Sequence, residues 1–207
     1  MIFPNSVYRL CLVTDRDLAG GRDLATLVVA AVRGGVSMVQ LREKTASTRE
    51  FLRQAIALKA ALAGSGVPLV INDRVDIALA VDADGVHVGQ SDMPVGEVRR
   101  LIGPGKIIGL SITNAAQIAQ PDVLGADYLG IGPIFAQATK ADAAQPLGIE
   151  GFARLRALVA GKQVMAIGGV KAQHAQALRA AGADGLAVVS AIVAAGDAAA
   201  AARGFSE

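Results

Sequence analysis

The sequence predicts an α/β protein of one class, a closed eight-stranded parallel (β/α)8 barrel (TIM barrel) that forms a single domain over residues 1–207. Three observations predict it: the chain length, the alternation of short apolar runs with amphipathic segments, and a repeated motif. The 207 residues suit one domain and lie at the low end of the range for such barrels, roughly 200 to over 400 residues. With 53% hydrophobic and 18% charged residues, the chain can form a packed core and is not intrinsically disordered.

Eight short apolar runs are the predicted strands. Strands that are covered on both faces have continuous apolar sequences, and alternation with helices makes neighbouring strands parallel through right-handed crossovers. Eight such units are the number that closes a barrel. The runs are Tyr8–Val13, Met38–Leu41, Leu69–Ile71, Gly85–Val88, Ile107–Leu110, Tyr128–Ile131, Val164–Ile167 and Gly185–Val189.

Apolar residues at helical spacing occupy segments between these runs, as expected for helices that pack against a sheet. Examples are Leu24, Leu27, Val28 and Ala31, then Phe51, Ala55, Leu58 and Leu62, and then Phe152, Leu155 and Leu158.

Three segments, 82–89, 125–132 and 182–189, share one pattern, in which Ala-Asp at a helix-ending turn leads into an apolar strand. Internal repetition of a β/α unit favours the closed barrel. The competing architecture is a doubly wound open sheet. It is disfavoured because the first βα turn, Thr14-Asp15-Arg16-Asp17, lacks the glycine spacing that brings a dinucleotide pyrophosphate against a helix.

Composition excludes several classes of function. A net charge of +2 with 3% aromatic residues and no Trp argues against a nucleic-acid partner. We find no stretch of the roughly 20 apolar residues that a bilayer requires, no signal-peptide pattern, and one cysteine, Cys11, which can form no internal disulfide. We therefore expect a cytoplasmic protein without a membrane partner. The sequence is compatible with a homo-oligomer.

Polar side chains follow nearly every predicted strand, at the end where such barrels build their active sites. Arg42 and Lys44 after the second strand, with Lys140 after the sixth, could hold phosphate charge, whereas any one of them alone could be a solvated loop residue. Asp73 and Asp92 follow neighbouring strands and could converge on one Mg²⁺. The alternative is structural: Asn72 and Asp73 in an Asx-turn or helix cap, and Asp92 as the cap of a helix near Pro94.

A second phosphate site is expected after the seventh and eighth strands. Gly168-Gly169 would offer backbone amides there, and Ser190 would stand at the start of the last helix.

Other chemistries lack support, because the HExxH, GxSxG and Walker A patterns are absent from the sequence. We interpret His87, between Val86 and Val88, as a hydrogen-bonded core or rim residue, His174 as solvent exposed, and Cys11 as a buried small hydrophobe.

At these residues the sequence resembles the thiamine-phosphate synthase (thiamine-phosphate pyrophosphorylase) family nearly end to end. The matching motifs are residues 12–15 (LVTD), 39–44 (VQLREK), 71–74 (INDR), 84–94 (DGVHVGQSDMP), 130–135 (GIGPIF), 139–140 (TK), 166–169 (AIGG) and 188–192 (VVSAI). The resemblance implies a (β/α)8 barrel that joins 4-amino-2-methyl-5-hydroxymethylpyrimidine diphosphate to a thiazole phosphate and releases pyrophosphate with Mg²⁺.

The resemblance also implies roles for individual residues. It assigns the pyrimidine diphosphate to Gln40, Leu41, Arg42, Glu43, Lys44, Asn72, Ser111 and Lys140, and Mg²⁺ to Asp73 and Asp92. It assigns the thiazole phosphate to Gln137, Ala138, Thr139, Gly168, Val189 and Ser190, with Gly169 beside them. The catalytic cations would be Lys140, Arg42 and Lys44. The chain departs from the family pattern at Gln137, where Thr is common, and at Ile112-Thr113-Asn114, where a His is frequent.

Two alternatives stay open at this point. A thiazole tautomerase shares the barrel but does not need the Mg²⁺ and diphosphate residues, so the presence of Arg42, Lys44, Asp73, Asp92 and Lys140 favours the synthase. A non-catalytic sensor of phosphorylated ligands could also be built on this fold.

Overall fold

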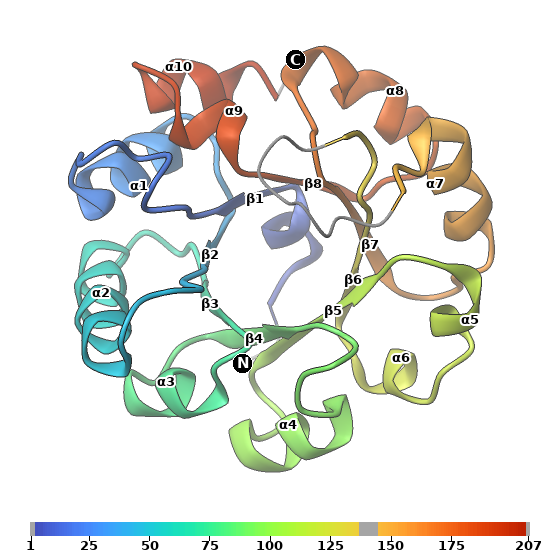
Figure 1. Cartoon of the computed structure of the whole chain (residues 1–207), viewed down its shortest axis with the longest axis horizontal. Helices are drawn as coiled ribbons and strands as arrows, with labels where there is room; N and C mark the ends of the chain where they lie inside the picture. The colour runs from blue at the N-terminus through green and yellow to red at the C-terminus, as the bar shows by residue number, and fades with distance from the viewer. Residues whose placement is uncertain (1–2, 137–144, 206–207) are drawn as a thin grey trace.

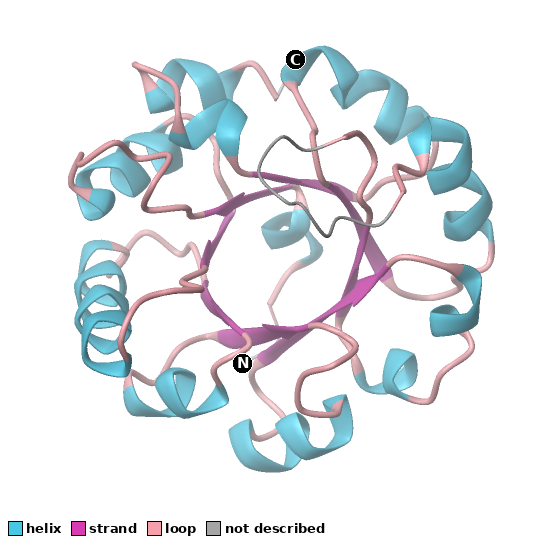
Figure 2. Ribbon diagram, viewed as in Figure 1, coloured by secondary structure: helices cyan, strands magenta, loops and turns pink. Residues whose placement is uncertain are grey.

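The computed structural model describes residues 3–136 and 145–205. Within these ranges, eight parallel strands form one closed barrel in chain order, and the last strand pairs with the first. Figures 1 and 2 show the strands as a central ring and the helices as a layer around it. The predicted closed (β/α)8 barrel is therefore confirmed. The strands are β1 Leu10–Val13, β2 Met38–Leu41, β3 Leu69–Asn72, β4 Gly85–Val88, β5 Ile107–Ile112, β6 Tyr128–Ile131, β7 Gln163–Ile167 and β8 Gly185–Val188.

The helices follow the strands as the apolar spacing predicts. Their bounds are η1 Asn5–Tyr8, α1 Leu24–Arg33, α2 Thr48–Ala61, α3 Val75–Ala80, α4 Val95–Ile102, α5 Ala115–Ile118, α6 Asp122–Gly125, α7 Gly148–Ala157, η2 Ala172–His174, α8 Ala175–Ala180, α9 Ser190–Val193 and α10 Ala198–Arg203. Side chains cap the N-termini of α1 and α2. The Asp23 carboxylate accepts a hydrogen bond from the Thr26 amide, and the Ser47 hydroxyl accepts one from the Glu50 amide.

Three predicted strands differ from the structure by one residue at one end: β3 also includes Asn72, β7 begins at Gln163, and β8 ends at Val188. Three other predictions differ by more than one residue or in burial. Tyr8 belongs to the 3-10 helix η1 and not to β1. Its sequence pattern resembles that of a strand because the side chain is buried, with its ring 5.5 Å from that of Tyr128 inside the barrel. The fifth strand continues two residues beyond Leu110, so that Ser111 lies within β5. Leu158 is 58% exposed and does not pack on the core, because α7 ends at Ala157.

The strands separate two apolar cores, because successive side chains point to opposite faces. Residues such as Leu12, Val39 and Ile71 pack outward against the helices. The second core fills the barrel and includes Cys11 and Met38. The interior also holds buried polar side chains from several strands, including Gln40, Asn72 and His87.

The repeated Ala-Asp motif has one structural role at all three positions. Each aspartate precedes an even-numbered strand, and its carboxylate accepts the backbone amide of a residue at the beginning of the preceding strand. The same carboxylate pairs with a cationic side chain from a helix. The sets are Asp84 with the Leu69 amide and Lys59, Asp127 with the Ile108 amide and Arg99, and Asp184 with the Val164 amide and Arg156.

We expect Asp127→Ala to destabilise the fold by about 1–3 kcal/mol, because the fully buried Ile108 loses the carboxylate that accepts its amide at 2.7 Å. Glu97→Ala is the control, since its exposed carboxylate pairs with Arg100 one helical turn away. Urea unfolding of the two variants measures the difference. Equal midpoints for Asp127→Ala and wild type would show that the motif does not anchor the strand.

Cys11 is fully buried in the barrel interior, and burial raises the pKa of its thiol to about 12. We therefore expect this single cysteine to resist a thiol reagent such as DTNB in the folded protein at mildly alkaline pH, and to react fully in guanidinium chloride. Rapid labelling of the folded protein would contradict the buried position.

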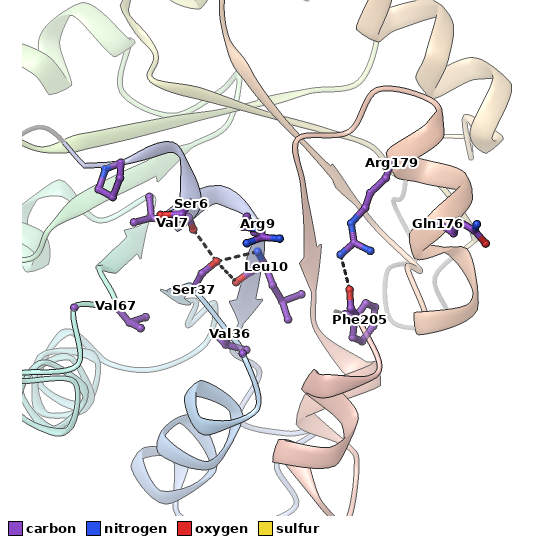
Figure 3. Close-up of a pocket in the computed structure, with 13 residues that line it drawn as sticks. Ser6, Val7, Arg9, Leu10, Val36, Ser37, Val67, Gln176, Arg179 and Phe205 are labelled. Atoms are coloured by element: carbon purple, nitrogen blue, oxygen red, sulfur yellow. Dashed lines mark hydrogen bonds between the residues drawn. The ribbon is translucent and has the colours of Figure 1, made fainter. Parts of the chain in front are cut away.

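A cavity of about 980 Å³ lies at the end of the barrel where the strands begin. Figure 3 shows the contacts that join the segments around it: the Ser37 hydroxyl accepts the Leu10 amide at 2.9 Å and donates to the Val7 carbonyl at 3.0 Å, and Arg179 donates to the Phe205 carbonyl. Active sites of this fold lie at the opposite end. We therefore interpret these contacts as structural.

No helix in residues 3–136 and 145–205 is long and apolar enough to cross a membrane. The cytoplasmic location stays a prediction.

Candidate active site

The carboxyl ends of β2, β3, β4 and β5 bring together most of the polar residues predicted for the first phosphate site. These strand ends form the mouth of the barrel, and the residues lie around it. Lys44 follows β2 and pairs with Asp73, which follows β3; Asp92 lies in the loop after β4; and Ser111 is in β5. The arrangement follows from the parallel topology, which places every strand end at one face.

The Lys44 Nζ atom lies 2.5 Å from Asp73 Oδ2. Asp73 has a positive φ of 63°, which is uncommon for a residue other than glycine but is tolerated by Asp, and its amide donates to the His87 carbonyl at 2.8 Å. The β3–β4 pairing thus continues through Asp73 and fixes its backbone. Because the Lys44 side chain is 53% exposed, the ion pair adds little to stability. Its value is that it places a cation and a carboxylate together at the mouth.

Asp92 is the second carboxylate of this cluster. Its Oδ2 accepts the Gly89 amide at 2.7 Å. Burial raises the pKa of Asp92, the Gly89 amide lowers it, and a hydrogen bond and like charge from Asp73 raise it further. Neighbouring carboxylates repel one another unless a proton or a cation lies between them. The pair therefore has the chemistry of a cation site.

The helix-capping alternative for these residues is wrong. The residue before α3 is Arg74 and the residue before α4 is Pro94, and neither helix start has a side-chain cap. The Asp92 carboxylate instead holds the loop after β4. Both aspartates are thus available at the mouth.

The remaining residues of the 40–44 segment differ in what they can offer a ligand. Gln40 is buried inside the barrel, while the Leu41 side chain packs in the outer core, so that Leu41 can present only its backbone at the mouth. Arg42 is half-buried, and its amide donates to the buried Thr14 hydroxyl at 3.1 Å. The Glu43 side chain is 3% exposed and lies 3.8 Å from Arg16, and burial raises its pKa.

His87 and Asn72 lie opposite one another in the β3–β4 register, and both are buried near the carboxyl ends of their strands. His87 Nδ1 lies 2.8 Å from the Tyr128 hydroxyl, and its Nε2 lies 2.9 Å from Ser111 Oγ. The prediction of a hydrogen-bonded core histidine is confirmed. Burial lowers the pKa of His87 to about 4, with a smaller opposing effect from Asp92.

Sequence reasoning missed Tyr128 and the side chain of Gln90. Burial raises the pKa of Tyr128 well above its ordinary value, and a hydrogen bond from the Gln40 side chain acts in the opposite direction. Gln90 Nε2 donates to the Ser111 carbonyl at 2.7 Å. The signal for Tyr128 was its interior position at the start of β6, which is opposite Gly109 in the β5–β6 register.

On the other side of the mouth, Gly168 and Gly169 follow β7 with φ angles of 95° and 70°. The Gly168 carbonyl accepts the Phe135 amide at 2.9 Å, and a Cβ atom on Gly169 would lie 2.8 Å from that of Phe135. Within the described ranges neither glycine amide donates to a backbone carbonyl. Val189 packs at the edge of the interior core.

Two expectations here need correction. Ser190 is exposed and begins α9, but α9 is followed by α10 and is not the last helix. His174 is half-buried and not solvent exposed, because its ring packs against Phe135 with the centroids 4.1 Å apart and the planes tilted by 38°. Gln137, Ala138, Thr139 and Lys140 lie outside the described residues.

The fold and this mouth define a class of protein: a (β/α)8 barrel with a charged site for a small ligand at the carboxyl ends of its strands. The family model described as "Thiamine monophosphate synthase" matches residues 10–192. The chain therefore belongs to this family, and the resemblance seen in the motifs is confirmed.

Individual relatives agree with the family match. The chain is 54% identical over 189 residues to the thiamine-phosphate synthase of Albidiferax ferrireducens, covering 91% of this chain and 86% of the relative. It is 53% identical over 196 residues to that of Chloroflexus aurantiacus, covering 95% and 90%. The solved thiamine phosphate pyrophosphorylase from Pyrococcus furiosus superposes with a TM-score of 0.87 at 34% identity, covering 98% of this chain and 95% of that one. These relatives do not support the tautomerase or the sensor alternative.

Proposed function

We propose that this chain is a thiamine-phosphate synthase. In this reaction it condenses 4-amino-2-methyl-5-hydroxymethylpyrimidine diphosphate with 4-methyl-5-hydroxyethylthiazole phosphate, or its carboxylated form. The products are thiamine phosphate and pyrophosphate, with CO2 released as well when the thiazole substrate is carboxylated. The observation that carries the proposal, beyond family membership, is the cluster of Lys44, Asp73 and Asp92 at the mouth of the barrel.

The pyrimidine diphosphate would bind on the side of β2 to β5. Lys44 and the half-buried Arg42 supply positive charge beside the two aspartates. Gln40, Asn72 and Ser111 offer hydrogen bonds from the interior at the same end of the barrel, where the pyrimidine ring can enter. Lys140 would add a third cation to the diphosphate, and the Glu43 segment would contribute through its backbone.

Mg²⁺ is the cation that fits the two carboxylates, which Asp73 and Asp92 would supply. The protein would supply these two carboxylates alone, because within residues 3–136 and 145–205 no group of three or more His, Cys, Asp or Glu side chains is arranged to hold a metal. Mg²⁺ commonly takes one or two protein carboxylates and completes its shell with substrate phosphates and water. When bound, it would neutralise charge on the diphosphate leaving group.

The thiazole phosphate would bind across the mouth. The Gly168 and Gly169 amides and the exposed Ser190 hydroxyl are suited to phosphate oxygens, and Val189 forms an apolar edge. Gln137, Ala138 and Thr139 would complete this half of the site.

The chemistry requires little from the protein besides charge and positioning. The C–O bond to the diphosphate breaks, the aminopyrimidine ring stabilises the resulting cation, and the thiazole nitrogen attacks it. A neutral ring nitrogen needs no general base. Arg42, Lys44 and Lys140 would stabilise the departing diphosphate, while the barrel mouth holds the two substrates in line and limits water.

A reconstitution assay tests the proposal. Purified protein is mixed with both substrates and Mg²⁺, and thiamine phosphate is detected by mass together with released pyrophosphate. We expect product only when both substrates are present, and none after EDTA treatment until Mg²⁺ is restored. Absence of thiamine phosphate from folded protein would overturn the proposed reaction, and undiminished product in EDTA would overturn the Mg²⁺ requirement.

A further inference from the structure

A line of hydrogen bonds crosses the barrel interior, from β6 through β4 to β5. The Tyr128 hydroxyl lies 2.8 Å from His87 Nδ1, and His87 Nε2 lies 2.9 Å from Ser111 Oγ. Tyr128 is 1% and His87 5% exposed, whereas Ser111 is half-buried. Ser111 is therefore the end of this line that reaches the mouth of the barrel.

Two glycines make room for the imidazole ring inside the barrel. A Cβ atom on Gly109 would lie 2.3 Å from both His87 Nδ1 and Tyr128 Cζ, and one on Gly130 would lie 3.3 Å from His87 Cε1. The absence of a side chain at these two glycines leaves room for the rings, and the ring centroids of His87 and Tyr128 are 5.4 Å apart. Turning the ring by 180° would place Cδ2 and Cε1 where the two nitrogens lie, so this orientation is the one that keeps both hydrogen bonds.

The direction of the hydrogen bonds follows from the donors available. A neutral imidazole has one N–H donor and one acceptor nitrogen, and the bond made by one nitrogen sets the state of the other. A phenol is a stronger acid than an aliphatic hydroxyl, so Tyr128 is the better donor and Ser111 the better acceptor.

We propose that His87 is a positioning residue that makes Ser111 a hydrogen-bond donor to the substrate. Nδ1 accepts the Tyr128 hydrogen, Nε2–H donates to Ser111 Oγ, and the Ser111 hydrogen is left for a ligand acceptor. The inference rests on the proposed function, in which Ser111 contacts the pyrimidine diphosphate. An anionic or ring-nitrogen acceptor at that position requires a donor, and the chain of bonds supplies one before the substrate arrives.

The first test observes the tautomer directly, without substrate. The chain has two histidines, so ¹⁵N-histidine labelling of His174→Gln leaves one imidazole signal, that of His87. We expect the proton-coupled, protonated nitrogen to be Nε2 and the unprotonated nitrogen to be Nδ1. A proton on Nδ1 would overturn the proposal, whatever the activity of the protein.

The second test asks whether Tyr128 acts through Ser111. Tyr128→Phe keeps the ring and removes the donor, and we expect kcat/KM for the pyrimidine diphosphate to fall about fivefold to tenfold. In a Ser111→Ala background the same change should have less than a twofold effect, because the terminal donor is already absent. Tyr8→Phe, which removes a hydroxyl from the same interior core, is the matched control and should leave kcat/KM unchanged.

Equal losses in both backgrounds would show that Tyr128 does not act through Ser111. Failure of the wild-type protein to form thiamine phosphate would overturn the proposed function instead. The tautomer measurement decides the inference in that case.

Discussion

Asp73→Asn and Asp92→Asn should each lower kcat/KM for thiamine phosphate formation by more than about a hundredfold, a loss of roughly 3 kcal/mol in transition-state stabilisation. Each change removes one of the two neighbouring carboxylates at the barrel mouth, where Asp73 contributes to the raised pKa of Asp92. Fewer anionic ligands would weaken Mg²⁺ binding, and the departing diphosphate would lose the charge that stabilises it. Steady-state kinetics at saturating and at limiting Mg²⁺ measure the effect.

The substitutions should leave the fold intact, since Asn keeps the shape of each side chain and tolerates the positive φ of residue 73. Asp76→Asn is the control: this carboxylate, 60% exposed, pairs with Arg74 in the same βα unit and lies outside the cluster. Wild-type turnover in both Asp73→Asn and Asp92→Asn at limiting Mg²⁺ would remove these residues from the metal site. A loss of activity that is matched by Asp76→Asn would point to a general effect of charge.

The sequence predicted the barrel well because its strands are buried on both faces, so that apolar runs mark them directly. Six of the eight runs lie within one residue of the observed strands at each end; the exceptions are Tyr8–Val13 and Ile107–Leu110. Those two are cases in which burial or polarity misleads. Tyr8 is an aromatic residue buried in the interior core, but it lies in η1 and not in the strand. Ser111 is polar, but it lies within β5.

The same topology explains why part of the site could be predicted. In a parallel barrel every strand ends at one face, so Lys44, Asp73 and Asp92 had to lie near the mouth wherever their strands paired. The ion pair and the contact between the two carboxylates depend on finer geometry, including the left-handed backbone of Asp73. No sequence pattern specifies that conformation for an aspartate.

The line of hydrogen bonds from Tyr128 through His87 to Ser111 could not be predicted from local sequence. It depends on the register of β4, β5 and β6, in which His87 lies opposite Gly109 and Gly109 opposite Tyr128. A glycine in the middle strand lets two large side chains meet across it. Periodicity shows only that each residue faces inward.

Gly109→Ala should therefore destabilise the protein by about 3 kcal/mol or more, at the upper end of the range for overpacking a core. The added methyl group would lie 2.3 Å from His87 Nδ1 and 2.3 Å from Tyr128 Cζ, and both rings are buried among side chains that cannot retreat. Thermal unfolding should show a midpoint lower by roughly 6–12 °C.

Gly96→Ala is the matched control, because it adds the same methyl group within α4, where nothing lies within 4 Å of the new atom. This change should raise stability slightly, since alanine favours a helix over glycine by roughly 0.5–1 kcal/mol. If Gly109→Ala unfolds at the wild-type temperature, the two rings do not occupy the space above Gly109. The barrel interior would then be packed differently, and the hydrogen-bond line through His87 would have no rigid support.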